Sequence, residues 1–389
     1  MPPIVGRVRI YDTTLRDGDQ MPGVELGPED KVVIGQALDS LGVDYIEAGF
    51  PASSTIDYTV VKRLAETTST RIAALARCTR RDIEAAVDAG AHLVHVFIAT
   101  SDTHLKYKLR MTRREVLEKA AWAVEYARSF GVDVLFSAED ATRTEKPYLV
   151  KVYRAVVSAG ARYINIPDTA GAATPWGMAG LVKTVRSALP SWVSIDVHCH
   201  NDFGLATANT LAGIYAGADG AQVTVNGFGE RAGNAPLEEV VAAIHFLMGG
   251  ETGVKLEKLT PTARMVAERF GIQLPPNKPI VGDNAFAHEA GIHVHGVLNN
   301  PATYEPIPPE SVGNRRRIVL GRHSGRHAVA WTLERLGIPA RQDLVEHILS
   351  RIKEAAPRIK KIDESTVARW ALEYLSGAGA DEAYSAHTG

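Results

Sequence analysis

Short runs rich in β-branched and apolar residues alternate with longer amphipathic stretches over residues 1–250. The short runs predict strands over residues 8–12, 45–48, 71–76, 93–98, 133–137, 163–166, 194–198 and 221–225. The longer stretches predict helices over residues 28–41, 80–89, 113–130, 147–159, 175–189 and 205–216. Strands that alternate with helices pair in parallel through right-handed crossovers, and eight such units close a barrel. We therefore predict a (β/α)8 TIM barrel.

Several predicted helices are followed by a glycine, which favours a left-handed end to the helix. These glycines are Gly42, Gly90, Gly131, Gly160 and Gly217. An open doubly wound sheet is the alternative architecture, because it shows the same alternation of strands and helices. The first turn after a predicted strand, residues 12–20, is not a glycine fingerprint of the dinucleotide-binding type. This difference favours the barrel.

The alternation stops beyond residue 250. A helix is predicted near residues 260–270, and the prolines at 275, 276 and 279 then indicate a linker. The remaining stretches that predict helices cover residues 325–336, 342–358 and 363–375. A mainly helical accessory region should therefore follow the barrel.

These patterns divide the chain into three parts. A catalytic barrel takes residues 1–275, a linker with a first accessory subdomain takes residues 276–325, and a helical second accessory subdomain with a tail takes residues 326–389. The tail, residues 376–389, is rich in Gly and Ala, so we expect it to fray.

Composition limits the kinds of partner. The formal net charge of the 389 residues is -2, which leaves no basic field for nucleic acid. We find no apolar run long enough to span a bilayer and no secretory leader at the N-terminus, so no membrane partner is expected. The two cysteines, Cys78 and Cys199, do not resemble a disulfide framework. We expect a cytoplasmic protein that acts on small molecules.

The segment 198–202 carries the clearest chemistry. His198 and His200 stand two residues apart at the end of a predicted strand, so both imidazoles point to the same face. Neutral imidazoles separated in this way can bind one metal ion, although two histidines bonded within a polar loop are the alternative. The carboxylate of Asp17, after the first strand, would complete a site of two histidines and one carboxylate with open positions.

Polar residues gather at the predicted C-terminal ends of the strands, where TIM barrels carry their active sites. They are Arg16, Asp17, Glu47, Arg77, His95, Ser137, Glu139, Asn165, Thr169, His198, His200 and Asn234. A 2-oxo acid could bind the open metal positions through its carboxylate and keto oxygens, which would make the keto carbon an electrophile.

Three charged residues of this set have competing interpretations. Arg16 could stabilise an alkoxide on the keto oxygen or form a surface ion pair. Glu139 could act in acid-base catalysis or satisfy free amides at a helix start. Glu47 is interpreted as structural, paired with a basic neighbour in the barrel mouth.

With these residues placed, the chain resembles the DRE-TIM metallolyase superfamily, and within it the 2-isopropylmalate, homocitrate and citramalate synthases. Residues 12–20 resemble the first signature of that group, with Arg16 and Asp17 in its arginine and metal-aspartate positions. Residues 198–206 through 226–234 resemble its second signature. The resemblance implies a metal-dependent Claisen-type condensation of acetyl-CoA with a 2-oxo acid, followed by release of CoA.

The same resemblance implies roles for individual residues. His198 and His200 would be metal ligands, Asn234 a nearby or outer ligand, and the ion zinc, manganese, cobalt or, less readily, magnesium. Thr169 and Ser137 would contact the 2-oxo acid or the pocket wall, and Glu139 would lie near the acetyl methyl group. His293 and Tyr304 resemble a histidine and a tyrosine that act in proton transfer. A homodimer with exchanged accessory helices is also implied.

The nature of the 2-oxo acid follows from a few pocket positions. Leu75 and Leu135 stand where lysine-pathway homocitrate synthases carry a His and an Arg for a distal carboxylate, so an apolar 2-oxo acid fits better. His95 and Asn165 also resemble the isopropylmalate-synthase pattern. The sequence Val294-His295-Gly296 departs from the Gln-Asp-Gly usual in bacterial isopropylmalate synthases. We predict 2-isopropylmalate synthase narrowly over homocitrate synthase, with citramalate synthase as a further alternative.

A lyase of the hydroxymethylglutaryl-CoA type shares the barrel and the pair of histidines. Those lyases carry a reactive cysteine in the loop after the last strand, and residues 228–234 contain none. The acyl-CoA lyase is therefore the less favoured enzyme class. The basic residues near 315–326 could meet CoA phosphates, although such charge runs are more often solvated surfaces.

Overall fold

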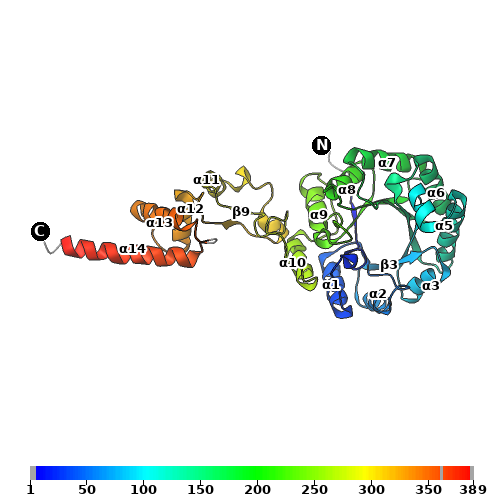
Figure 1. Cartoon of the computed structure of the whole chain (residues 1–389), viewed down its shortest axis with the longest axis horizontal. Helices are drawn as coiled ribbons and strands as arrows, with labels where there is room; N and C mark the ends of the chain where they lie inside the picture. The colour runs from blue at the N-terminus through cyan, green and yellow to red at the C-terminus, as the bar shows by residue number, and fades with distance from the viewer. Residues whose placement is uncertain (1–5, 360–361, 386–389) are drawn as a thin grey trace. The chain divides into compact units, whose positions relative to one another are not determined.

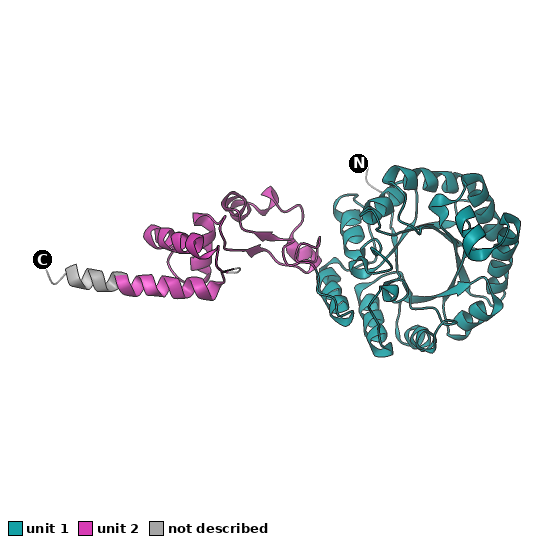
Figure 2. Ribbon diagram, in the orientation of Figure 1, with its two compact units in different colours: residues 1–274 teal, residues 275–389 magenta. Residues whose placement is uncertain are grey.

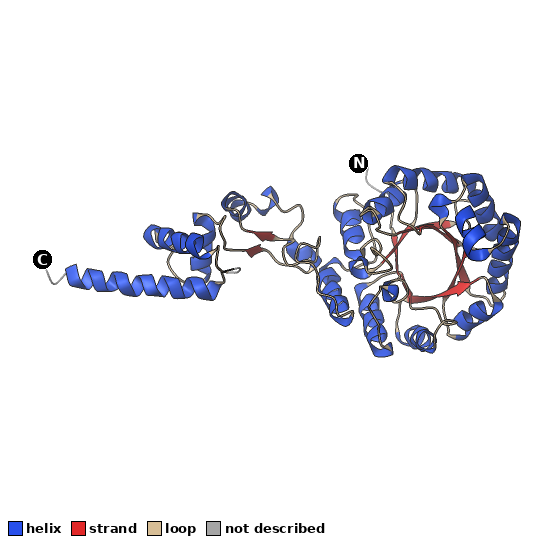
Figure 3. Ribbon diagram, viewed as in Figure 1, coloured by secondary structure: helices blue, strands red, loops and turns tan. Residues whose placement is uncertain are grey.

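The computed structural model describes residues 6–359 and 362–385, and its strands β1 to β8 close into a barrel in chain order (Figures 1 and 3). Adjacent strands pair in parallel, and β1 pairs with β8 to complete the ring. The strands are β1 (Arg9–Asp12), β2 (Tyr45–Glu47), β3 (Arg71–Arg77), β4 (Leu93–Ala99), β5 (Asp133–Glu139), β6 (Tyr163–Asp168), β7 (Ser194–Cys199) and β8 (Gly220–Val223). The predicted TIM barrel is confirmed.

Helices surround the strands, as the alternating pattern predicted. They are α1 (Pro28–Leu41), α2 (Thr55–Thr67), α3 (Arg80–Asp88), α4 (Asp102–His104), α5 (Arg113–Arg128), α6 (Lys146–Ser158), α7 (Pro175–Ala188), α8 (Ala206–Tyr215), α9 (Leu237–Phe246) and α10 (Leu259–Arg269). Helices α2 and α9 were not predicted. Helix α2 buries only the narrow apolar stripe Val60, Val61 and Leu64, and α9 is apolar on most sides.

The glycines predicted to end helices adopt the left-handed conformation. Their φ angles are 92° at Gly42, 80° at Gly90 and Gly131, and 109° at Gly160 and Gly217. Residues with a Cβ are strained at such angles, so these positions stop each helix before the next strand begins.

Several strands extend beyond their predicted ends at the carboxyl side. Strand β5 reaches Glu139, β6 reaches Asp168 and β4 reaches Ala99. Within the barrel, Tyr11, Tyr45, Ala73, Leu93 and Leu135 form an inner apolar layer. Polar side chains lie above this layer, at the carboxyl ends of the strands, where the apolar packing stops.

The chain separates into two compact units, residues 1–274 and 275–389 (Figure 2). The second unit has helices α11 (Gly291–Asn299), α12 (Arg326–Arg335), α13 (Gln342–Ala355) and α14 (Glu364–Ser385), together with a small parallel pair, β9 (Ala287–His288) and β10 (Arg317–Ile318). The accessory region is therefore mainly, but not entirely, helical. Its division into two subdomains at residue 325 stays a prediction.

The apolar core of the second unit joins α11 to the later helices. Val294 on α11 packs in one buried cluster with residues of α12, α13 and α14, among them Val329, Ile348 and Trp370. Helix α14 continues through Ser385, whereas the sequence pattern predicted an end near Leu375. The last part of the predicted tail, residues 386–389, lies outside the described residues.

In the turn after β8 a glycine at position 233 is required by both its backbone angle and its surroundings, and this gives a test. Gly233 has a φ of 84°, and a Cβ at this position would lie 1.9 Å from the carbonyl oxygen of Gly227. We expect Gly233→Ala to lower the free energy of unfolding by more than 2 kcal/mol, because a backbone clash adds to the roughly 1–2 kcal/mol of left-handed strain. Urea unfolding followed by circular dichroism measures the change.

Gly131 provides the matched control, because its φ is 80° and a Cβ would meet nothing within 4 Å. Gly131→Ala should cost only the left-handed strain, about 1 kcal/mol. Equal losses of stability in the two variants would contradict the close approach at Gly233.

Candidate metal centre and substrate pocket

Asp17 and Arg16 lie in a tight turn directly after β1. The backbone amides of Arg16, Asp17 and Gly18 all donate to the carbonyl oxygen of Thr13, which winds the chain into one compact turn. Thr14 fixes the base of this turn, since its hydroxyl donates to Asp12 and accepts from the amide of Val225 after β8. Asp17 is therefore presented from the carboxyl end of β1 as a buried side chain.

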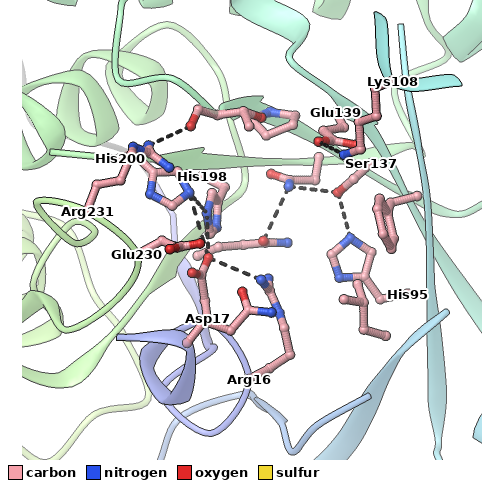
Figure 4. A pocket seen from close by; sticks show the side chains of 17 residues that line it. Arg16, Asp17, His95, Lys108, Ser137, Glu139, His198, His200, Glu230 and Arg231 are labelled. Atoms are coloured by element: carbon pink, nitrogen blue, oxygen red, sulfur yellow. Dashed lines mark hydrogen bonds and ion pairs between the residues drawn. The ribbon is translucent and has the colours of Figure 1, made fainter. Parts of the chain in front are cut away.

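His198 is the next-to-last residue of β7, and His200 directly follows the end of the strand at Cys199 (Figure 4). The Nε2 atoms of the two imidazoles are 3.3 Å apart. The Oδ2 atom of Asp17 lies 3.2 Å from Nε2 of His198 and 3.8 Å from Nε2 of His200. The predicted convergence of Asp17, His198 and His200 is present in the structure. Their ligand atoms lie within 4.8 Å of one another, and in the described part of the chain no other group of three or more His, Cys, Asp or Glu side chains has a spacing that could hold a metal ion.

The protonation states of these groups suit a cation. Burial opposes the ionisation of Asp17, but the charge of Arg16 and a hydrogen bond from His198 outweigh it, so the pKa of Asp17 lies well below its usual value. Burial and the neighbouring His198 lower the pKa of His200 to about 4. A carboxylate and an unprotonated imidazole are thus available at neutral pH.

Asn234 completes the polar surroundings of the trio. It forms an isolated antiparallel bridge with His200, and its Nδ2 donates to the carbonyl of Phe228. Its buried Oδ1 atom has no hydrogen-bond partner among the described residues. A buried amide oxygen without a partner is costly unless something binds it, so the donor set fits a divalent metal ion.

A continuous chain of polar contacts runs across the barrel from Arg16. Its guanidinium Nε donates to Glu47 at 2.6 Å, and the other carboxylate oxygen of Glu47 meets Nδ1 of His95. Nε2 of His95 lies 2.6 Å from the hydroxyl of Ser137, which also accepts from Asn165 at 2.8 Å. Burial opposes ionisation of Glu47, but Arg16 and His95 outweigh it and lower its pKa to about 2. Glu47 therefore holds Arg16 and His95 in fixed orientations.

The metal trio and four members of this series of polar contacts, Arg16, His95, Ser137 and Asn165, line one cavity of about 360 Å³. The cavity is lined by Arg16, Asp17, Gln20, Leu75, His95, Phe97, Lys108, Ser137, Glu139, Asn165, Pro167, Thr169, His198, His200, Gln222, Glu230 and Arg231. Most residues selected from the sequence therefore line a single space (Figure 4).

Leu135 does not line this cavity. It is two residues before Ser137 on β5 and packs in the inner apolar layer with Tyr11 and Leu93. Leu75, the other predicted specificity residue, does line the cavity, and so does the large apolar side chain of Phe97.

Several lining residues were missed from the sequence. Lys108 donates to Glu139 at 2.5 Å from a π-helical segment, Leu105–Leu109, in the loop after β4. Arg231 binds both carboxylate oxygens of Asp202 and the carbonyl of Thr169. Glu230 precedes it in the glycine-rich turn after β8. That turn, residues 226–234, was the sequence signal for Glu230 and Arg231, whereas Lys108 lies in no recognisable motif.

His293 and Tyr304 belong to the second unit and are described within it alone. His293 lies on α11, and the ring centroids of His293 and Tyr304 are 4.2 Å apart. Both side chains are exposed, with 44% of the Tyr304 surface accessible. The structure thus brings these two residues together, and their relation to the metal trio stays a prediction.

Comparison with known families follows the division into two units. A family model described as HMGL-like matches residues 7–266, and one described as Homocitrate synthase post-HMGL domain-like matches residues 280–360. The chain belongs to the HMGL-like family. This membership agrees with the resemblance seen in residues 12–20 and 198–206.

Curated relatives cover most of this HMGL-like chain. One from Ignicoccus hospitalis, named "Probable 2-isopropylmalate synthase", is 57% identical over 89% of this chain and 87% of its own length. Relatives from Sulfurisphaera tokodaii and Saccharolobus solfataricus, named "2-isopropylmalate synthase", are 50% and 49% identical over 95% of this chain and 96% of their own length. One from Methanopyrus kandleri, named "Putative (R)-citramalate synthase CimA", is 48% identical over 95% of this chain and 72% of its own length.

Among solved structures, the hydroxymethylglutaryl-CoA lyase from Pseudomonas aeruginosa matches with a TM-score of 0.62 at 24% identity. The match covers 70% of this HMGL-like chain and 95% of the lyase, and at this identity it shows the shared fold alone.

Two substitutions test the metal trio. Asp17→Asn removes the anionic ligand and His198→Ala removes an imidazole, so each should weaken Mn²⁺ binding by more than about 100-fold, since even outer partners of metal ligands are worth 10–100-fold. Isothermal titration measures the affinity and circular dichroism checks the fold. Asp102→Asn, an exposed change, should bind like the parent. Parental affinity in either ligand variant would remove that residue from the site.

Proposed function

We propose that this protein condenses acetyl-CoA with an apolar 2-oxo acid and then releases CoA, as a 2-isopropylmalate synthase. The observation that carries the proposal is the meeting of Asp17, His198 and His200 at a cavity with Leu75 in its wall. In the reaction the methyl carbon of acetyl-CoA loses a proton and bonds to the keto carbon, and the keto oxygen gains a proton. Water then hydrolyses the thioester, which frees the CoA thiol.

The metal-binding residues are Asp17, His198 and His200, with Asn234 as a nearby or outer ligand. Two imidazole nitrogens with oxygen donors suit zinc, manganese or cobalt more readily than magnesium. An ion held by these residues would supply Lewis-acid polarisation of the substrate's keto group.

Arg16 stabilises the negative charge that develops on the keto oxygen, because its guanidinium is held beside Asp17 by Glu47. Glu139 lies near the acetyl methyl group, with its carboxylate paired to Lys108. His293 and Tyr304 act in proton transfer, and they reach the barrel of a second copy in a homodimer with exchanged accessory helices. The resemblance to the synthase family supports these last roles.

Charge in the pocket supports an apolar substrate over 2-oxoglutarate. The basic residues that line the cavity are Arg16, Lys108 and Arg231, and each is already in an ion pair with a carboxylate. A second substrate carboxylate would have to share one of these already paired cations or displace its partner. Ser137, His95, Asn165 and Thr169 provide polar contacts for the shared 2-oxo acid end, while Leu75 faces the variable side chain.

The two cysteines, Cys78 and Cys199, are both free and buried, which supports a reducing compartment, the cytoplasm. No helix among residues 6–359 and 362–385 combines the length and the apolar character that crossing a bilayer requires.

A CoA-release assay tests the reaction and the substrate together. With acetyl-CoA, we expect 2-oxoisovalerate to be consumed fastest, pyruvate more slowly and 2-oxoglutarate least, and we expect a chelator to abolish release. Thiol detection by a chromogenic disulfide follows each reaction. Preference for pyruvate would favour a citramalate synthase, and preference for 2-oxoglutarate would contradict the assignment of an apolar pocket.

Leu75→Ser tests the apolar wall directly. The change removes apolar contact with the isopropyl group, worth about 1–3 kcal/mol, so kcat/KM for 2-oxoisovalerate should fall roughly 10–100-fold. Pyruvate, which has only a methyl group, should be affected less. Leu247→Ser, at a side chain 73% exposed, is the control and should retain parental kinetics. An equal loss for both substrates would show that Leu75 does not select the side chain.

A further inference from the structure

Lys31 on α1 is a fully buried lysine that no step of the proposed reaction uses. Only 2% of the residue is exposed to solvent. Burying an ammonium group is costly unless it is paired and hydrogen-bonded, so the partners of Lys31 are the key to its role.

The ammonium group has three donors and meets three acceptors. Nζ lies 2.6 Å from Oδ1 of Asp57, 2.7 Å from Oδ2 of Asp19 and 3.4 Å from the carbonyl oxygen of Leu15. Its three donors are thereby matched by acceptors from two segments of the chain, residues 15–19 and the helix start that carries Asp57.

Two of these acceptors flank Arg16 and Asp17 in the turn directly after β1, which we call the metal turn. Leu15 directly precedes Arg16, and Asp19 follows Asp17 by two residues. Lys31 therefore holds the turn from both sides of the Arg16-Asp17 pair, on the backbone before it and on a side chain after it.

The third acceptor, Asp57, links Lys31 to the start of helix α2. The other oxygen of Asp57 accepts from the amide of Phe50 at 2.9 Å, and the amide of Asp57 donates to Ser54, which caps α2. The position of the ammonium group is thus fixed by α1, where Lys31 lies, and by the start of α2.

We propose that Lys31 is a positioning residue that sets the orientation of Asp17 toward His198 and His200 and, through the same turn, of Arg16. The inference rests on the metal site assigned under the proposed function. It predicts that removing the ammonium group weakens metal binding beyond any general loss of stability, because Asp17 then has to be ordered when the ion binds.

The test compares Lys31→Met with Arg9→Met. Arg9 also forms an ion pair with a buried carboxylate, that of Asp196, and it is the first residue of β1, at the end of the strand opposite the turn that carries Asp17. Mn²⁺ dissociation constants from isothermal titration and electron paramagnetic resonance are measured on the full chain, with thermal unfolding of the metal-free proteins alongside.

We expect both variants to melt at lower temperature, Lys31→Met to bind Mn²⁺ at least 10-fold more weakly, and Arg9→Met to bind within 2-fold of the parent. Asp19→Asn, at a partly exposed side chain, covers the case in which Lys31→Met does not fold, and it should weaken Mn²⁺ binding at least 3-fold. Parental Mn²⁺ affinity in Lys31→Met would overturn the role of Lys31 but leave the metal site intact. If Lys31→Met does not fold, parental affinity in Asp19→Asn would have the same meaning. Absence of Mn²⁺ binding by the parent would overturn the metal site as well.

Discussion

Negative charge buried at the mouth of the barrel must be balanced by positive charge, and this constraint governs the arrangement of the loops. Asp17 and Glu47 are both buried, and Arg16 contacts each of them. Leaving one partner of such a pair alone costs about 3–5 kcal/mol, far more than a typical loop contact. The loops after the strands are therefore fixed by electrostatic pairing, whereas the strands below are fixed by apolar packing.

The same pairing gives the pocket wall two chemically different kinds of contact. Glu47 and His95 connect Arg16 to Ser137 and Asn165, which gives the wall a fixed set of polar contacts. Leu75 and Phe97 belong to the wall of the same cavity and offer no hydrogen bonds. A 2-oxo acid has the same division, with a polar carboxylate and keto group at one end and a variable side chain at the other.

Much of this arrangement could be predicted from the sequence because it depends on local patterns. Buried parallel strands are continuous apolar runs, and two histidines two residues apart on a strand must share a face. The contacts of Lys31 and Lys108 could not be predicted, because Asp57 and Glu139 lie 26 and 31 residues away and only the packing of the barrel brings them close. Leu135 was placed in the pocket from the resemblance to homocitrate synthases, yet it lies one inward-facing position below Ser137 and packs in the inner apolar layer. Helix α11 was also missed, since its glycines and histidines obscure the helical pattern.

The structure of α11 has a consequence for mutations in the accessory unit. Val294 and Val297 are its buried residues, while the adjacent His293 is exposed. Val294 is part of the apolar core of the second unit, together with Ile348 and Trp370. A substitution deep in that core would therefore displace α11 and redirect the exposed His293 imidazole, although the altered side chain itself never reaches the surface.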